Sequence, residues 1–126
     1  MQMLYQADIG HQTPDEVQAT FWKAGDPVEP EVRDFAEELF QVAQAQQAKI
    51  DGLIAEHSAH WRLERMAAVD RNLLRMAVAE LVGVKSTPFP VVINEALEIG
   101  RCYCATESIN FLNGILDSIA RSVIGQ

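Results

Sequence analysis

A chain of 126 residues in which 48% of the side chains are apolar is long enough for one hydrophobic core and too apolar to be a disordered chain. The net charge of −8 argues against a protein that binds nucleic acid by bulk electrostatic attraction. No run of 18 apolar residues could span a membrane, and the opening segment lacks the basic and apolar regions of a signal peptide, so we expect a single cytoplasmic domain over residues 1–126.

Helix signals begin near the amino terminus. Thr13 and Glu16 have the spacing of a capping box, and Pro14 suits the first helical position. The helix that they begin is expected to end at Gly25, which suits a helix C′ position. Residues 31–54 then place apolar side chains at mostly three- and four-residue spacing, which predicts one long amphipathic helix with acidic residues in its first turns.

Further helical segments follow in the second half of the chain. The segment HWRLERM predicts a short helical piece anchored by its tryptophan and leucine. Residues 68–83 are apolar over a wide arc and end at a glycine, so we expect a central helix there. Two prolines in KSTPFP break the chain before the helical period resumes over residues 91–103. Thr106 or Ser108 is expected to cap the helix that comes next.

The segment FLNGIL, residues 111–116, contains an Asn-Gly pair between apolar residues, which is the strongest short hairpin signal. Hairpin strands should alternate apolar and polar residues, whereas here the apolar residues stand in adjacent pairs. A helical register instead gathers one apolar face, made of Ile109, Leu112, Leu116, Ile119, Ala120 and Val123. We therefore expect a helix in which Gly114 allows close approach of a neighbouring helix. The fold class is all-α, a bundle of about six or seven helices.

Sequence patterns of catalytic and metal sites are absent. The chain has no Gly-rich phosphate loop, no Gly-x-Ser-x-Gly elbow and no His-Glu-x-x-His motif. Cys102 and Cys104 are too close for an unstrained disulfide, and neither has an obvious activating base nearby in the sequence. His57, His60 and Glu64 could share a helical face, but no second motif converges on them. We expect no enzyme, no cofactor and no metal site.

Two aromatic residues suit binding better than a place in the core. Phe111 lies to one side of the apolar face of the last helix, and Tyr103 lies at a helix end beside Arg101. An aromatic ring next to a cation suits stacking on the bases of single-stranded RNA. The alternative is that the two rings pack against each other, which is the commoner role of aromatic residues. The four arginines within residues 62–75 suggest phosphate binding, but Arg71 and Arg75 are expected instead to pair with Glu80 or with acidic residues on neighbouring helices.

The segments LYQAD, VDRNLLRMAVAEL, INEALEIG and, at the proper distance, FLNGILD together resemble the NusB family of bacterial transcription antitermination factors. The resemblance covers essentially the whole chain and implies a compact all-α protein of two helical subdomains. It also implies binding to the boxA RNA of ribosomal RNA transcripts, together with the small-subunit ribosomal protein NusE, within an RNA polymerase antitermination complex. Carried over by position, it implies RNA contacts at Tyr103, Glu107 and Phe111, and NusE contacts at Tyr5 and Asp70.

The sequence departs from the family pattern at three points. It begins inside the first helix, without the arginine-rich arm that usually precedes that helix. Ala7 stands where many relatives have a larger side chain, and Asn110 stands where a basic one would help RNA binding. We therefore expect weak RNA binding with a shallow dependence on salt. Two other functions stay open: a fragment related to the amino-terminal domain of ribosomal-RNA cytosine methyltransferases, and a homodimeric helical protein that does not bind RNA.

Overall fold

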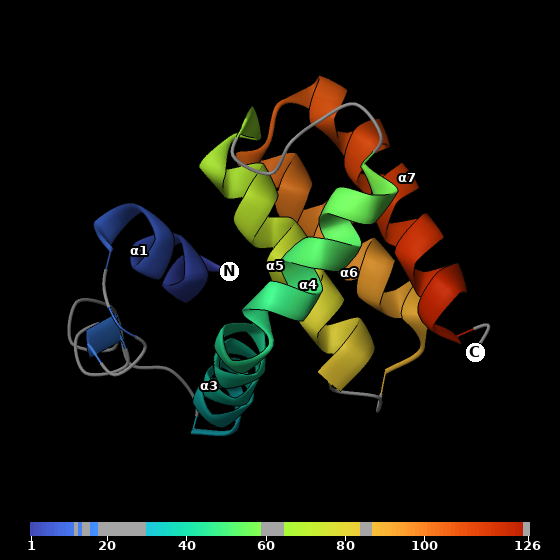
Figure 1. The fold of residues 1–126 in the computed structure, drawn as a ribbon. Helices are drawn as coiled ribbons and strands as arrows, with labels where there is room; N and C mark the ends of the chain where they lie inside the picture. Colours follow the sequence, from blue (N-terminus) through green and yellow to red (C-terminus); the bar gives the residue numbers. More distant parts are fainter. Residues whose placement is uncertain (12, 14–15, 18–29, 59–64, 84–86, 125–126) are drawn as a thin grey trace.

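The computed structural model describes residues 1–11, 13, 16–17, 30–58, 65–83 and 87–124. Its main helices, labelled in Figure 1, are α1 (Gln2–Gly10), α3 (Pro30–Ala45), α4 (Gln47–His57), α5 (Ala68–Gly83), α6 (Phe89–Tyr103) and α7 (Thr106–Ile124). No strand occurs within these described ranges, and the predicted all-α class is confirmed. No helix among the same residues is long and apolar enough to cross a membrane.

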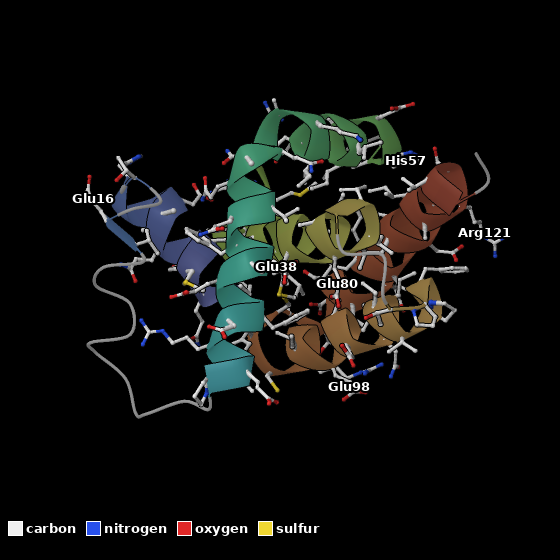
Figure 2. The ribbon with its side chains drawn as sticks, turned by 90° about the horizontal axis from the view of Figure 1, so that it is seen from below. Glu16, Glu38, His57, Glu80, Glu98 and Arg121 are labelled. Carbon is white, nitrogen blue, oxygen red and sulfur yellow. The ribbon has the colours of Figure 1, made fainter. Side chains whose placement is uncertain are left out.

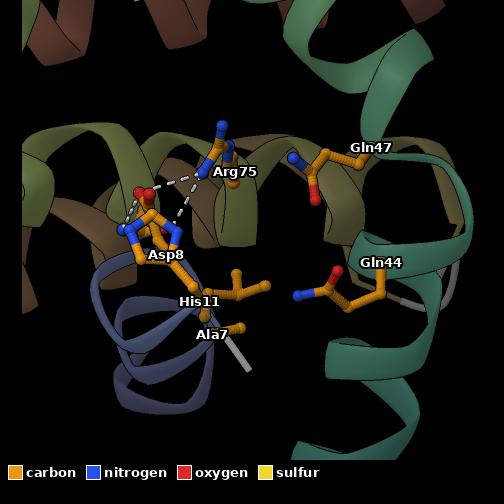
Figure 3. Close-up of a pocket in the computed structure, with 8 residues that line it drawn as sticks. Ala7, Asp8, His11, Gln44, Gln47 and Arg75 are labelled. Carbon is orange, nitrogen blue, oxygen red and sulfur yellow. Dashed lines mark hydrogen bonds and ion pairs between the residues drawn. The ribbon is translucent and has the colours of Figure 1, made fainter. Parts of the chain in front are cut away.

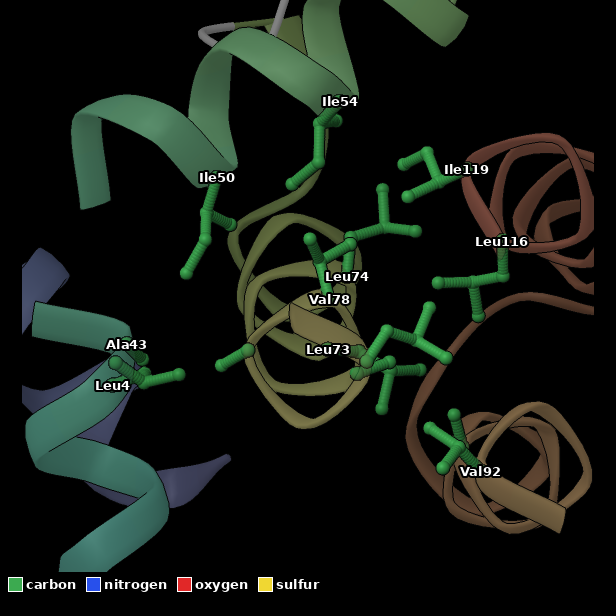
Figure 4. Close-up of a cluster of buried hydrophobic side chains, with 14 of the residues drawn as sticks. Leu4, Ala43, Ile50, Ile54, Leu73, Leu74, Val78, Val92, Leu116 and Ile119 are labelled. Carbon is green, nitrogen blue, oxygen red and sulfur yellow. The ribbon is translucent and has the colours of Figure 1, made fainter. Parts of the chain in front are cut away.

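Helix α5 is the centre of the bundle, as the sequence predicts. It contacts each of the other helices named above. Leu73, Leu74, Ala77 and Val78 are almost completely buried, because their spacing places apolar side chains around a wide arc that neighbouring helices cover. Figure 4 shows side chains of the surrounding helices converging on this core.

The other helices form two groups around α5 (Figure 1). Helices α1 and α3 contact each other on one side, and α6 and α7 contact each other on the other side. Helix α4 joins the groups because it contacts both α3 and α7. Figure 2 shows Glu98 and Arg121 pointing away from the bundle, where each belongs to an exposed ion pair along its own helix.

The prediction of one long helix over residues 31–54 is wrong. The chain forms two helices, α3 and α4, which are separated at Gln46, where φ is −111° and ψ is 22°. Val42 on α3 lies against Gly83 at the end of α5, whereas Ile50 and Ile54 on α4 are fully buried in the core that α5 and α7 share. The bend allows both apolar faces to be buried, and this gain outweighs the local preference for a straight helix.

The expected helix caps are partly confirmed. The backbone N–H of Glu16 donates to Oγ1 of Thr13 at 3.2 Å, as in a capping box. Pro14, Gly25 and most of the segment HWRLERM lie outside the described residues. The expected cap at Thr106 or Ser108 is wrong, because α7 begins at Thr106 and both residues are helical.

The Asn-Gly pair lies within α7, so the helical prediction for FLNGIL is confirmed. Leu112, Ile115 and Leu116 are buried, while Asn113 and Gly114 are exposed. A Cβ atom added at Gly114 would meet nothing within 4 Å. The expected close approach of another helix at Gly114 is therefore wrong. The glycine faces solvent, and its backbone freedom only weakens the helix.

Replacing Gly114 by alanine is expected to raise the free energy of unfolding by about 0.5 to 1 kcal/mol, because alanine loses less backbone entropy in an exposed helix. Gly83→Ala is the matched control, since its new Cβ atom would collide with Cγ1 of Val42 and destabilise the protein. Urea unfolding of the two variants measures both effects. A loss of stability in Gly114→Ala would contradict the exposed position.

Candidate nucleic-acid and partner interface

A tight corner joins α6 to α7 and carries several candidate residues. Only Cys104 and Ala105 separate the two helices, and the N–H of Cys104 donates to the carbonyl oxygen of Gly100 at 2.7 Å. A Cβ atom at Gly100 would lie 3.1 Å from Cδ1 of Ile109 and 3.2 Å from Cδ2 of Leu73. Glycine at this position thus lets α6 approach α5 and α7 closely, and the corner lies directly against the core.

The RNA candidates lie on and beside this corner. Tyr103 is 57% exposed at the end of α6. Glu107 is exposed in the first turn of α7, where the helix dipole stabilises a negatively charged carboxylate. Phe111 is half-buried one turn further along. Arg101 forms an exposed ion pair with Glu98, with Nη1 2.5 Å from Oε1.

A surface cavity of about 340 Å³ brings some of these residues together with the start of α5. Phe111, Met66 and Ala67 supply apolar surface to it, and Glu107 and Asp70 supply carboxylates. The full lining is Arg65, Met66, Ala67, Asp70, Glu107, Ser108 and Phe111. Tyr103, Arg101 and Tyr5 do not line it. The structure thus groups Asp70, the predicted NusE contact, with two of the predicted RNA contacts.

Asp70 is held in place by a hydrogen bond from the first turn of α7. The hydroxyl of Ser108 donates to Oδ2 of Asp70 at 3.0 Å. Burial, followed by the influence of the nearby Asp70 carboxylate, raises the pKa of the Cys104 thiol to about 12. The thiol therefore stays protonated at neutral pH, which makes it a poor nucleophile.

Tyr5 lies on α1, 40% exposed. Helix α1 is anchored to α5 by Asp8, which accepts hydrogen bonds from Arg71 at 2.7 Å and from Asn72 at 2.9 Å. Oδ2 of Asp8 also lies 3.1 Å from Nη1 of Arg75. The network fixes the helix that presents Tyr5 to solvent.

The arginines of α5 pair with acidic residues on neighbouring helices, as expected. Arg75 donates from Nε and Nη2 to the two carboxylate oxygens of Asp51 on α4, at 2.9 and 3.0 Å. Arg71 and Arg75 both reach Asp8 on α1. Neither forms the suggested pair with Glu80, a buried residue whose pKa is raised by desolvation and by the nearby charge of Glu95. These guanidinium groups serve the fold rather than a phosphate site.

A second cavity, of about 360 Å³, lies between α1 and the junction of α3 with α4 (Figure 3). Figure 3 shows Gln44 and Gln47 on one wall, facing Asp8 and His11 on the other. The full lining is Leu4, Ala7, Asp8, His11, Gln44, Gln47, Asn72 and Arg75. Its charged groups already pair with one another or with Asp51, so the cavity has no excess charge to attract a phosphate. It contains none of the candidate binding residues.

The metal hypothesis gains no support from the described part of the chain. Nδ1 of His57 lies 2.6 Å from Oγ of Ser118, within hydrogen-bond distance. His60 and Glu64 lie outside the described residues. Among the residues that the structure describes, no group of three histidine, cysteine or acidic side chains could hold a metal ion.

Comparison with known proteins establishes the family. The profile of the NusB family matches residues 1–121. The chain belongs to the NusB family. A transcription antitermination protein NusB from Koribacter versatilis (strain Ellin345) is 54% identical over 123 residues, which cover 98% of this chain and 84% of the relative. NusB family members are transcription antitermination proteins and not enzymes, as expected for this chain.

Solved structures support the same assignment. T. maritima NusB superposes with a TM-score of 0.82 at 29% sequence identity. The superposition covers 99% of this chain and 91% of the T. maritima chain. A crystal structure of the antitermination factors NusB and NusE in complex with double-stranded RNA matches with a TM-score of 0.86 at 26% identity, over 95% of this chain and 89% of that chain. NusB proteins therefore share this helical arrangement, including one crystallised with both a protein partner and RNA.

Proposed function

We propose that this NusB family protein binds boxA RNA of ribosomal RNA transcripts as a heterodimer with NusE, within an RNA polymerase antitermination complex. The observation that carries the proposal is the cavity beside Phe111, which joins an aromatic face to hydrogen-bond acceptors at the surface. The relative crystallised with NusE and double-stranded RNA supports NusE and an RNA as partners. Because the target is a nascent bacterial transcript, the proposal includes the expected cytoplasmic location.

The cavity suits an unstacked nucleobase. A base that enters it can stack on the ring of Phe111, while the carboxylate of Glu107 accepts hydrogen bonds from base amino groups. Arg65 on the opposite wall supplies a cation within the same cavity. With a net charge of −8, the protein gains affinity from stacking and base contacts rather than from neutralising many phosphates. Tyr103 and Arg101 lie outside the cavity and extend the proposed RNA surface around the corner.

Tyr5 and Asp70 are the proposed contacts for NusE. Tyr5 presents a partly exposed ring on a helix that an ion-pair network anchors, and aromatic residues on rigid elements are common anchors of protein interfaces. Size-exclusion chromatography with and without NusE tests this part. A complex of one copy of this chain with one NusE chain is expected, whereas a homodimer that NusE leaves unchanged would favour the alternative of a homodimeric protein without RNA binding.

Phe111→Ala is expected to weaken binding of single-stranded boxA RNA by about fivefold or more, because stacking of one base on an aromatic ring contributes about 1 to 3 kcal/mol. Fluorescence titration of labelled RNA, with and without NusE, measures the loss. Phe35→Ala is the matched control, since Phe35 is an exposed aromatic residue on α3 that does not line this cavity. Equal affinity of wild type and Phe111→Ala would contradict the proposed RNA site.

A further inference from the structure

The carboxylate of Asp70 is the point at which three parts of the chain meet. It lies in the first turn of α5 and accepts a hydrogen bond from Ser108 in the first turn of α7, and the Cys104 thiol in the corner before α7 lies near it. Ser108 is 38 residues away from Asp70 in the sequence. One acidic side chain thus ties the corner to the helix at the centre of the bundle.

The Ser108 hydrogen bond lies next to residues of the proposed RNA surface. Ser108 follows Glu107 directly, so the donor is covalently next to a proposed RNA contact, and Cys104 follows Tyr103 in the same way. Phe111 lies one turn after Ser108 on the same helix. Hydrogen bonds to a charged acceptor are stronger than neutral ones, and a partly buried carboxylate makes them more specific in direction. Loss of the Asp70 carboxylate would free the corner to shift relative to Met66 and Arg65 across the cavity.

We propose that Asp70 is a positioning residue for RNA binding: it holds the α6–α7 corner so that Glu107 and Phe111 face the start of α5. The inference rests on the proposed RNA function, but it assigns Asp70 a role in RNA binding by the protein alone. This role is separate from the proposed contact with NusE.

The test is RNA titration without NusE, using Ser108→Ala, which removes a hydrogen-bond donor and leaves Asp70 in place. We expect RNA affinity to fall about three- to tenfold, the range of one typical intramolecular hydrogen bond. Ser108→Thr keeps the hydroxyl and is expected to restore most of the affinity. Ser118→Ala is the control for stability. Ser118 lies on α7, as Ser108 does, but away from the cavity, and its hydroxyl oxygen lies 2.6 Å from Nδ1 of His57 on α4. Ser118→Ala is expected to leave RNA affinity unchanged.

Two further measurements separate positioning from direct contact. In the double variant of Asp70→Ala with Ser108→Ala, the loss of affinity should equal that of Asp70→Ala alone, because Ser108 acts through Asp70. Asp70→Ala should also speed alkylation of Cys104 relative to exposed Cys102, because release of the corner exposes the half-buried Cys104 thiol. Additive losses of affinity, or an unchanged rate at Cys104, would overturn the inference.

The outcome for Phe111→Ala distinguishes this inference from the proposed function. If Phe111→Ala weakens RNA binding and Ser108→Ala does not, Asp70 has no positioning role and the RNA site stands. If Phe111→Ala has no effect, the RNA site itself is wrong, whatever the behaviour of Cys104.

Discussion

Leu74→Ala is expected to lower the free energy of unfolding by about 3 to 4 kcal/mol. Leu74 has no exposed surface and belongs to the buried cluster that also contains Ile54 of α4 and Ile119 of α7 (Figure 4). Truncation removes apolar area from the core and leaves a cavity among helices that cannot all move inward, because α5 contacts helices on both of its sides. The expected cost therefore lies near the middle of the range of about 2 to 5 kcal/mol for such substitutions.

Urea denaturation followed by circular dichroism measures this loss. Leu74→Met is the matched control, since it conserves volume and is expected to cost less than about 1.5 kcal/mol. A loss below about 1 kcal/mol in Leu74→Ala would show that the α4–α5–α7 junction is loosely packed, contrary to the complete burial of Leu74.

The central helix could be predicted from the sequence because its apolar period is strong and its end is marked by Gly83. The break between α3 and α4 could not. The apolar period continues across Gln46, and no proline or glycine stands at residues 45–47 to indicate a bend. The bend results from packing, since α3 contacts α1 whereas α4 contacts α7, and contacts between distant segments leave no local mark in the sequence.

The contacts of the helical glycines also could not be predicted from the local sequence. The helical period correctly placed Gly114 in a helix, but it could not tell whether a neighbour lies against it. The glycines that do make close contacts are Gly83, against Val42, and Gly100, against Leu73 and Ile109. Both look like ordinary helix residues or caps in the sequence, because their partners come from other helices.

The candidate site was predictable as single residues but not as a cavity. Family resemblance pointed to Phe111, Glu107 and Asp70, and the structure places all three around the cavity of about 340 Å³. Ser108 was expected to cap a helix, but its hydroxyl donates to Asp70, 38 residues earlier. Arg65 and Met66 were not predicted as lining residues, because a local sequence pattern does not indicate a cavity that two separate segments line. Their proximity to Glu107 and Phe111 depends on how α5 packs against α7.

Asp8→Ala is expected to destabilise the protein by about 2 to 3 kcal/mol at neutral pH, somewhat less than for a fully buried ion pair because Asp8 is 21% exposed. The substitution removes the carboxylate to which Arg71, Asn72 and Arg75 all donate hydrogen bonds. Arg75 keeps Asp51, but the guanidinium of Arg71 loses a charged acceptor at 2.7 Å. Thermal unfolding at pH 7 measures the loss. Asp117→Ala is the matched control, because its ion pair with Arg121 is exposed and is expected to contribute less than about 0.5 kcal/mol.

The pH dependence identifies the charge as the cause. Burial opposes ionisation of Asp8, but hydrogen bonds from Arg71 and Asn72 and the charges of Arg71 and Arg75 outweigh it, so the pKa of the carboxyl lies below its ordinary value of 3.8. A carboxyl whose pKa is lowered by folding stabilises the protein fully above that ordinary value, and the contribution is lost as the pH falls through the folded-state pKa. The difference between wild type and Asp8→Ala should therefore be constant from pH 5 to 7 and shrink below about pH 4. A difference that persists in acid would mean that Asp8 acts through packing alone.

Asp8→Ala should also affect NusE binding, because the proposed contact Tyr5 lies on α1. At pH 7 the variant should weaken NusE binding only to the extent that α1 detaches from α5.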